Sequence, residues 1–199
     1  GKDSMSMKQK YPKEEVVSPG TVIISATAHS DNFRKTVEPY LKEKNSNLYY
    51  INMSSCEYNL GGSALFQSNN KVGKKCNDIK STKYFKKIFD SIQIAIKKDL
   101  IYSGHDISSG GLITCLLEMC FVSDDLGLNI NLSNVNEKDI IKLLFSENHG
   151  IIFQANKEIE KHLSSEDIRF INIGSCEKSD YLMISKNDFK LNLDINYYR

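Results

Sequence analysis

The sequence predicts an α/β (α+β) fold in which helices pack on a mixed β-sheet. Two observations lead to this prediction. Apolar, β-branched runs of strand length intermix with amphipathic stretches of helix length. The connections between successive strands also vary, from a short turn to a whole helix. Short turns join antiparallel strands, whereas helical crossovers permit parallel ones, so we expect a sheet that contains both.

Length and charge limit the number of domains and the partners. The chain has 199 residues, of which 40% are hydrophobic, enough for one substantial core and a small appendage. We expect residues 1–20 to be a linker with the end of a preceding lobe, and residues 21–199 to form one lobe. The net charge of +1 argues against nucleic acid or a membrane surface as a partner.

Cysteine and histidine usage indicates the compartment. The five cysteines are scattered without a Cys-x-x-Cys pair, which favours a reduced, cytoplasmic location. Cys115 and Cys120 lie in an apolar run, so we expect them to be small buried hydrophobes. His29, His149 and His162 are dispersed without metal-ligand spacing, and we expect structural or solvated roles for them.

The first third of the chain contains two strand-like runs. Residues 21–28 (TVIISATA) are β-branched and apolar on both sides, which predicts a central strand covered on both faces. Residues 48–53 (LYYINM) should form a second strand. Residues 11–18 have the composition of a connector, and residues 33–41 are ambiguous because Pro39 limits a helix there.

The clearest helix covers residues 81–98, with Ser81 as its cap. It follows a glycine-rich turn (LGGS, residues 60–63), a short helical stretch at residues 64–67 and a polar loop at residues 69–80. Its apolar residues recur at three- and four-residue intervals and should face the core: Phe85, Ile88, Phe89, Ile92 and Ile96. The lysines on the opposite side indicate a solvated face.

Elements of both kinds continue to the end of the chain. We expect strands at residues 100–102, 127–132, 150–155 and 168–173, and helices at residues 112–121, 136–145 and 157–163. In the helix at residues 136–145, the residues expected to face inward are Ile140, Ile141, Leu144 and Phe145. Residues 181–185 and 189–193 should form an antiparallel pair joined by a short turn.

The stretch YSGHDISSGGL (residues 102–112) has the pattern of a strand–loop–helix ligand site. Ser108 or Ser109 can cap the helix that follows. Gly110 and Gly111 have no side chains that would shield the amides of the first turn from an anion. Asp106, at the strand end, is a hard oxygen ligand of the kind that Mg²⁺ takes when it also holds nucleotide phosphates. The alternative is a glycine-rich tight turn with a solvated aspartate.

Three neighbouring features have a structural and a functional interpretation. The glycines of residues 60–63 can present amides to a ligand, or they can let the short helix pack closely on the sheet. Histidine is a common general base in proteins, but we expect His105 to orient Asp106 by a hydrogen bond rather than to act as a base. We expect Glu118 to be a capped or paired structural carboxylate.

Three motifs occur in one order along the chain: GKDSMSMK (residues 1–8), LGGSAL (residues 60–65) and GHDISSGGL (residues 104–112). With residues 22–26 (VIISA) and 144–150 (LFSENHG), they resemble the second synthetase-like half of the large single-chain phosphoribosylformylglycinamidine synthases. The likeness covers residues 1–155 and is vague beyond them.

This resemblance implies the C-terminal lobe of the aminoimidazole-ribonucleotide-synthetase-like superfamily. It also implies a ligase that uses ATP and glutamine to convert formylglycinamide ribonucleotide to formylglycinamidine ribonucleotide in purine synthesis. The implied cofactors are Mg²⁺ and ATP or ADP, with Asp106 as a metal ligand and Ser108 as a nucleotide contact; no catalytic residue is assigned. Gly110 and Gly111 are assigned to the nucleotide site only because amides at the start of a helix attract anions, and not from the resemblance. Ser109 stands where that family usually has aspartate.

The implied partners are the other parts of the same polypeptide: the first synthetase half, the first lobe of the second half and a glutaminase domain. Because the sequence starts without methionine and ends abruptly, we expect a fragment. Without those other parts, we expect it to be inactive as an amidotransferase by itself. Lys2 and Ser4 can face a substrate or phosphate, or can lie in an exposed linker. Two alternatives stay open, namely a related ATP-dependent synthetase or kinase of the same superfamily and a non-catalytic scaffold lobe.

Overall fold

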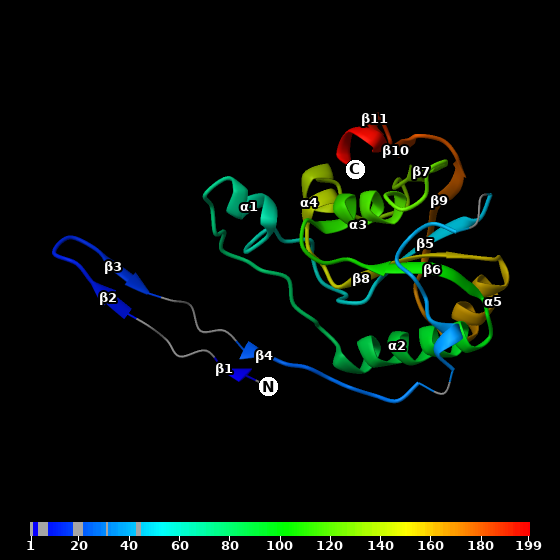
Figure 1. Ribbon diagram of the computed structural model, residues 1–199, viewed down its shortest axis with the longest axis horizontal. Coiled ribbons are helices and arrows are strands. Elements are labelled where there is room, and N and C mark those ends of the chain that lie inside the picture. Colours follow the sequence, from blue (N-terminus) through cyan, green and yellow to red (C-terminus); the bar gives the residue numbers. More distant parts are fainter. Residues whose placement is uncertain (1, 4–7, 18–21, 31, 43–44) are drawn as a thin grey trace. The chain divides into compact units, whose positions relative to one another are not determined.

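The computed structural model describes residues 2–3, 8–17, 22–30, 32–42 and 45–199 (Figure 1). The chain divides into two compact units, Gly1–Arg34 and Lys35–Arg199. Ser4, a candidate for contact with a substrate or phosphate, lies outside the described residues.

The first unit contains two short antiparallel ribbons. One pairs β1 (Lys2–Asp3) with β4 (Val22–Ile23), and the other pairs β2 (Lys8–Lys10) with β3 (Glu15–Val17). The Tyr11 N–H donates to the Glu14 carbonyl oxygen at 2.8 Å and closes the second ribbon. The prediction of a plain connector at residues 11–18 is therefore wrong, because part of that stretch forms a strand.

The central strand expected at residues 21–28 is also wrong. Residue 21 lies outside the description, only β4 is strand, and residues 24–28 have no regular structure. The side chains of Ile23 and Ile24 are 58% and 81% exposed. Composition favours extended backbone here, but a central strand needs partners on both edges and covered faces, and the described residues supply only the short pairing with β1.

A seven-stranded mixed sheet forms the centre of the second unit, in the order β11-β10-β7-β9-β5-β8-β6. Its strands are β5 (Asn47–Asn52), β6 (Ile101–Asp106), β7 (Leu126–Asn131), β8 (Gly150–Ala155), β9 (Ile171–Lys178), β10 (Tyr181–Lys186) and β11 (Phe189–Asp194). Neighbouring strands are antiparallel except β7 and β10, which are parallel. The predicted mixed sheet and its terminal hairpin are confirmed, although β9 begins three residues later than expected.

Helices cover both faces of this sheet (Figure 1). Helices α3 (Gly111–Cys120), α4 (Ile140–Phe145) and α6 (Ile195–Tyr198) contribute to the core on one face, and α2 (Thr82–Lys97) and α5 (Glu158–Ser165) to the core on the other. Two short helices contribute no residue to either core: α1 (Ala64–Ser68) and the 3₁₀ helix η1 (Phe33–Lys35). Successive strand residues point to opposite faces, so Tyr50 belongs to the core with α3 and α4, and Tyr49 to the core with α2 and α5. Among the described residues, no helix is long and apolar enough to cross a membrane.

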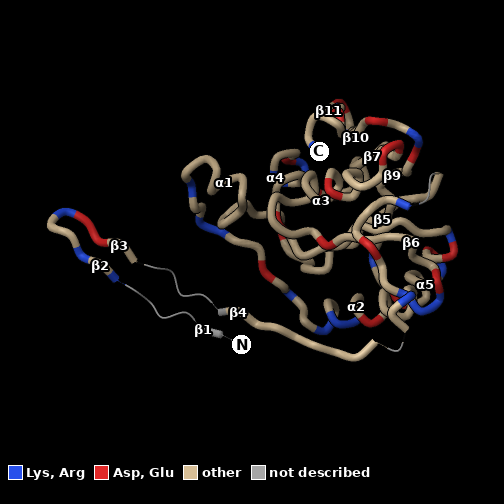
Figure 2. Tube along the Cα trace, in the orientation of Figure 1, with Lys and Arg blue, Asp and Glu red and all other residues tan. Residues whose placement is uncertain are grey.

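Helix α2 agrees with the prediction in extent but not in every buried residue. The Ser81 hydroxyl accepts the Tyr84 N–H at 3.2 Å, which confirms the cap. Ile88 and Ala95 are fully buried, whereas Phe89 is 52% exposed. A helix turns about 100° per residue, so Phe89 lies beside the buried stripe centred on Ile88. Figure 2 shows the lysines along this helix, of which Lys83, Lys86 and Lys97 are exposed and Lys87 is half-buried, so the predicted solvated face is confirmed.

Helix α4 is shorter than the predicted helix at residues 136–145. The Asp139 carboxylate accepts the N–H groups of Ile141 and Lys142 at 2.9 and 3.2 Å, so the helix begins directly after Asp139. Leu143 and Leu144 are buried, whereas Ile141 is 46% exposed, contrary to the expected inward face.

Three of the five cysteines are buried, which predicts a pattern of thiol reactivity. Burial raises the pKa of Cys120 to about 12 and of Cys176 to about 11, and it raises the pKa of Cys115 above its usual range. Since the thiolate is the reactive form, iodoacetamide at pH near 8 should label exposed Cys76 in the folded protein and these three only after denaturation. Peptide mapping by mass spectrometry measures this, and labelling of Cys115 in the folded protein would contradict the buried position.

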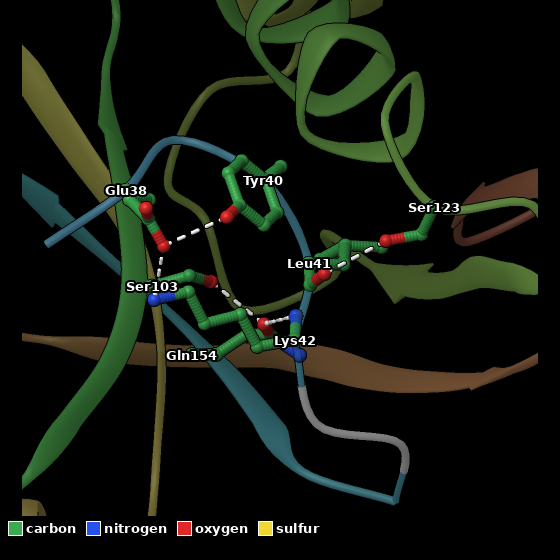
Figure 3. Close-up of polar contacts among 7 residues, drawn as sticks. All are labelled: Glu38, Tyr40, Leu41, Lys42, Ser103, Ser123 and Gln154. Atoms are coloured by element: carbon green, nitrogen blue, oxygen red, sulfur yellow. Dashed lines mark hydrogen bonds and ion pairs between the residues drawn. The ribbon is translucent and has the colours of Figure 1, made fainter.

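The segment of residues 36–42 is fastened to β6, an edge strand of the sheet (Figure 3). The Gly104 N–H donates to the Glu38 carbonyl oxygen at 3.0 Å. The fully buried Gln154 side chain accepts the Ser103 hydroxyl at 2.6 Å and the Lys42 N–H at 2.9 Å. These bonds fix the strand directly before Asp106.

Candidate functional site

Three loops meet at one end of the sheet. Asp106 ends β6 and pairs with Ile151, while Asn52 ends β5 and pairs with Gly150 at the start of β8. The loops at this end carry the glycine-rich turn before α1, the GHDISSGGL motif before α3 and the FSENHG segment before β8. The structure therefore brings together three segments that are far apart in the sequence.

Glu147 joins the two glycine-rich loops. Its Oε1 accepts the Ala64 N–H at 2.8 Å and the Gly110 N–H at 2.9 Å. Sequence reasoning missed this residue, although it lies in the LFSENHG segment that contributed to the family resemblance. A carboxylate directly after a helix was the available signal, but nothing local indicated which amides it would meet.

Ser146 makes a second connection beside Glu147. Its hydroxyl donates to the Asn59 carbonyl oxygen at 3.0 Å and accepts from Asn77 Nδ2 at 3.1 Å. Ser146 itself is buried and ends helix α4. The long loop around α1 is thus held against the end of α4 by side-chain bonds on both sides of the glycine-rich turn.

Asp106 stands at the strand end with its side chain 75% exposed. His105 Nδ1 lies 2.8 Å from the Asp106 carbonyl oxygen and 3.5 Å from its carboxylate. A carbonyl oxygen only accepts, so the shorter contact requires a hydrogen on Nδ1 and fixes the main chain of Asp106. His105 Nε2 lies 3.4 Å from the Glu118 carboxylate, so the predicted pairing of Glu118 requires a hydrogen on this nitrogen as well.

The start of helix α3 differs from the prediction that a serine caps it. The N-cap is Gly110, with a left-handed φ of 86° and no side-chain cap. The Gly111 N–H donates to the Ser108 carbonyl oxygen at 3.1 Å, and the Gly110 N–H is the one bound by Glu147. Ser108 is exposed. The roles of Ser108, Gly110 and Gly111 in nucleotide binding stay predictions.

The exposed Asp106 carboxylate fits a single oxygen ligand for magnesium. Within the described ranges, no group of three or more His, Cys, Asp and Glu side chains is arranged to hold a metal ion. Magnesium commonly keeps several waters and takes only one or two carboxylates besides nucleotide phosphates. A magnesium ion at Asp106 would therefore take its other ligands from water, phosphate or groups outside this chain.

Comparison with solved structures supports the fold. Thermotoga maritima PurL complexed with FGAR matches with a TM-score of 0.65 and 12% identity, over 83% of this chain and 29% of that chain. Thermotoga maritima PurL complexed with ATP matches with a TM-score of 0.61 and 10% identity, over 82% and 27%. At these identities the likeness shows a shared fold, and the predicted fold class is confirmed.

Comparison with curated sequences confirms the resemblance found from the motifs. A phosphoribosylformylglycinamidine synthase from Homo sapiens is 36% identical over 159 residues, which is 79% of this chain and 12% of that protein. The probable enzymes of Arabidopsis thaliana and Caenorhabditis elegans are 37% and 38% identical, over 79% and 83% of this chain. The chain spans only 11% and 14% of their lengths.

A model of one protein family matches residues 53–181, a stretch that includes all three loops of the candidate site. The chain therefore belongs to the family described as AIR synthase related protein, C-terminal domain.

Proposed function

We propose that this chain is a lobe of a phosphoribosylformylglycinamidine synthase and contributes to a magnesium–nucleotide site. The whole enzyme would be the ATP- and glutamine-dependent ligase that converts formylglycinamide ribonucleotide to formylglycinamidine ribonucleotide. Relatives with that name at 36–38% identity support this assignment. Because the chain spans 11–14% of these relatives, the other synthetase half, the first lobe and the glutaminase would lie elsewhere in a longer polypeptide.

The observation that carries the nucleotide site is Asp106. Its carboxylate is 75% exposed at a strand end, next to the loop that leads into α3. Bound magnesium would neutralise phosphate charge there. Asp106 would hold the metal and the exposed Ser108 hydroxyl would donate to a phosphate oxygen. Gly110 and Gly111 enter the proposal as the turn that presents Ser108, near a helix end that favours negative charge.

A scaffold lobe without a nucleotide is the second candidate. The amides of Gly110 and Gly111 already have protein acceptors, which favours a structural role for this turn. A cytoplasmic location also belongs to the proposal, because the cysteines are odd in number and scattered.

Asp106→Asn in the protein that carries this chain tests the nucleotide site. The substitution keeps the shape and removes the charge that magnesium prefers, so ADP or ATP that co-purifies with the protein should fall on the order of tenfold or more. Ser108→Ala should have a smaller effect, about fivefold, because one neutral hydrogen bond of about 1 kcal/mol is lost. Chromatography of nucleotide released by denaturation measures both.

Asp188→Asn is the matched control for this experiment. Asp188 is an exposed carboxylate in the turn between β10 and β11, at the other edge of the sheet from β6. This variant should retain nucleotide like the unmodified protein. Undiminished nucleotide in Asp106→Asn would instead refute Asp106 as the metal ligand and leave the glycine-rich loop as a turn.

A further inference from the structure

One oxygen of Glu147 binds two main-chain amides that belong to different loops. The Ala64 N–H is the first of helix α1, and the Gly110 N–H belongs to the N-cap of α3. The two distances to Oε1, 2.8 and 2.9 Å, are those of good hydrogen bonds. Bonds to a carboxylate are stronger than bonds to a neutral acceptor, and both helix ends favour negative charge.

Packed elements fix the place of Glu147. It follows Ser146, which ends α4 and is bonded to the loop around α1. Helix α3 packs directly on the end of α4, since a Cβ atom on Gly111 would lie 2.7 Å from the Leu144 carbonyl oxygen. The position of Glu147 is therefore set by the packing of α3 on α4 as well as by its bonds to the two loops.

The loop between Asp106 and α3 is bonded at both ends. The Ile107 N–H donates to the Gly150 carbonyl oxygen at 2.8 Å, and the Gly110 N–H donates to Glu147. Only Ser108 and Ser109 lie between these two bonds, and both are exposed. With its ends fixed, the loop has few conformations left, so Ser108 is held near Asp106 before any ligand arrives.

We propose that Glu147 is a positioning residue that holds the two glycine-rich loops in one arrangement and thereby places Ser108 beside Asp106. The Glu147 carboxylate keeps both amides when a nucleotide binds, rather than yielding the Gly110 amide to a phosphate. The role in nucleotide binding rests on the proposed function, whereas the connection between the loops does not.

Two substitutions of Glu147 in the protein that carries this chain test the proposal. Glu147→Ala leaves both amides without their acceptor, so hydrogen exchange at Ala64 and Gly110 should accelerate together by on the order of tenfold or more. Retention of ADP in the presence of Mg²⁺ should fall by on the order of tenfold, per folded protein. Glu147→Gln keeps an acceptor oxygen and should restore most of both properties.

Asp139→Ala is the matched control. Asp139 also accepts two main-chain amides, but both belong to α4 itself. Its removal should destabilise the protein, as a lost helix cap does, without changing exchange at Gly110 or retention of ADP. This comparison separates positioning from a general loss of stability.

Each possible result of these experiments supports or overturns a stated part of the proposal. Greater ADP retention in Glu147→Ala would overturn the proposal, because it would mean that the carboxylate competes with phosphate for the Gly110 amide. Accelerated exchange with unchanged ADP retention would overturn the positioning role. If Asp106→Asn retains as much nucleotide as the unmodified protein, the proposed function fails. Hydrogen exchange in Glu147→Ala then tests only whether Glu147 connects the two loops. Faster exchange at both the Ala64 and Gly110 amides supports this connection, and faster exchange at one or neither refutes it.

Discussion

Replacing Ile88 with aspartate should lower the free energy of unfolding by about 3–5 kcal/mol, the scale of an unpaired charge in a protein core. Ile88 is fully buried on α2, in the core that also contains Tyr49, Phe153 and Ile159. An aspartate there loses the packing of the isoleucine and either keeps a desolvated charge or takes up a proton. Urea unfolding followed by circular dichroism measures the change from the midpoint and slope.

Phe89→Asp is the control on the same helix. Phe89 adjoins Ile88 in sequence but is 52% exposed, so its replacement should change the free energy of unfolding by less than about 1 kcal/mol. Partly buried Ile92, which packs against the same core as Ile88, should give an intermediate loss. Equal losses at positions 88 and 89 would contradict the orientation of α2.

Helix α2 shows which features the apolar periodicity of a sequence can predict and which it cannot. The apolar spacing and Ser81 predicted the extent of the helix correctly, because both act within the segment itself. Phe89 was assigned to the core because it lies four residues after Phe85, a spacing that also fits a helix face. The centre of the buried stripe is set by packing against α5 and the sheet, which local spacing does not contain.

Residues 22–28 and Glu147 show two further limits. A β-branched run predicts extended backbone, yet whether it becomes a central strand depends on partner strands elsewhere. Asp106 was recognised because a strand-like run leads into it. Glu147 was not, since its partners are main-chain amides that reach it only through the spatial order β5-β8-β6, in which strands distant in sequence are neighbours.

Gly111→Ala should destabilise the protein by about 2–5 kcal/mol, more than the same change at Gly62. Both glycines have left-handed φ angles, 77° and 75°, which cost an alanine about 1–2 kcal/mol. A Cβ atom on Gly62 meets nothing within 4 Å, so no further loss is expected. On Gly111 it would lie 2.7 Å from main-chain atoms of Leu144 and Phe145, and relief requires α3 and α4 to separate.

Gly111→Ala and Gly62→Ala also separate the role of Gly111 in packing from any role in ligand binding. Unfolding curves measure the loss of stability, and the nucleotide retained per folded protein measures binding. Equal losses of stability for Gly111→Ala and Gly62→Ala would contradict the close approach of α3 to α4. Because the Gly111 N–H already donates to Ser108, we expect retention to fall only in proportion to the loss of folded protein. A fall beyond that proportion would instead show that the turn at Gly111 helps to position the nucleotide site, since alanine keeps the N–H but displaces the start of the helix.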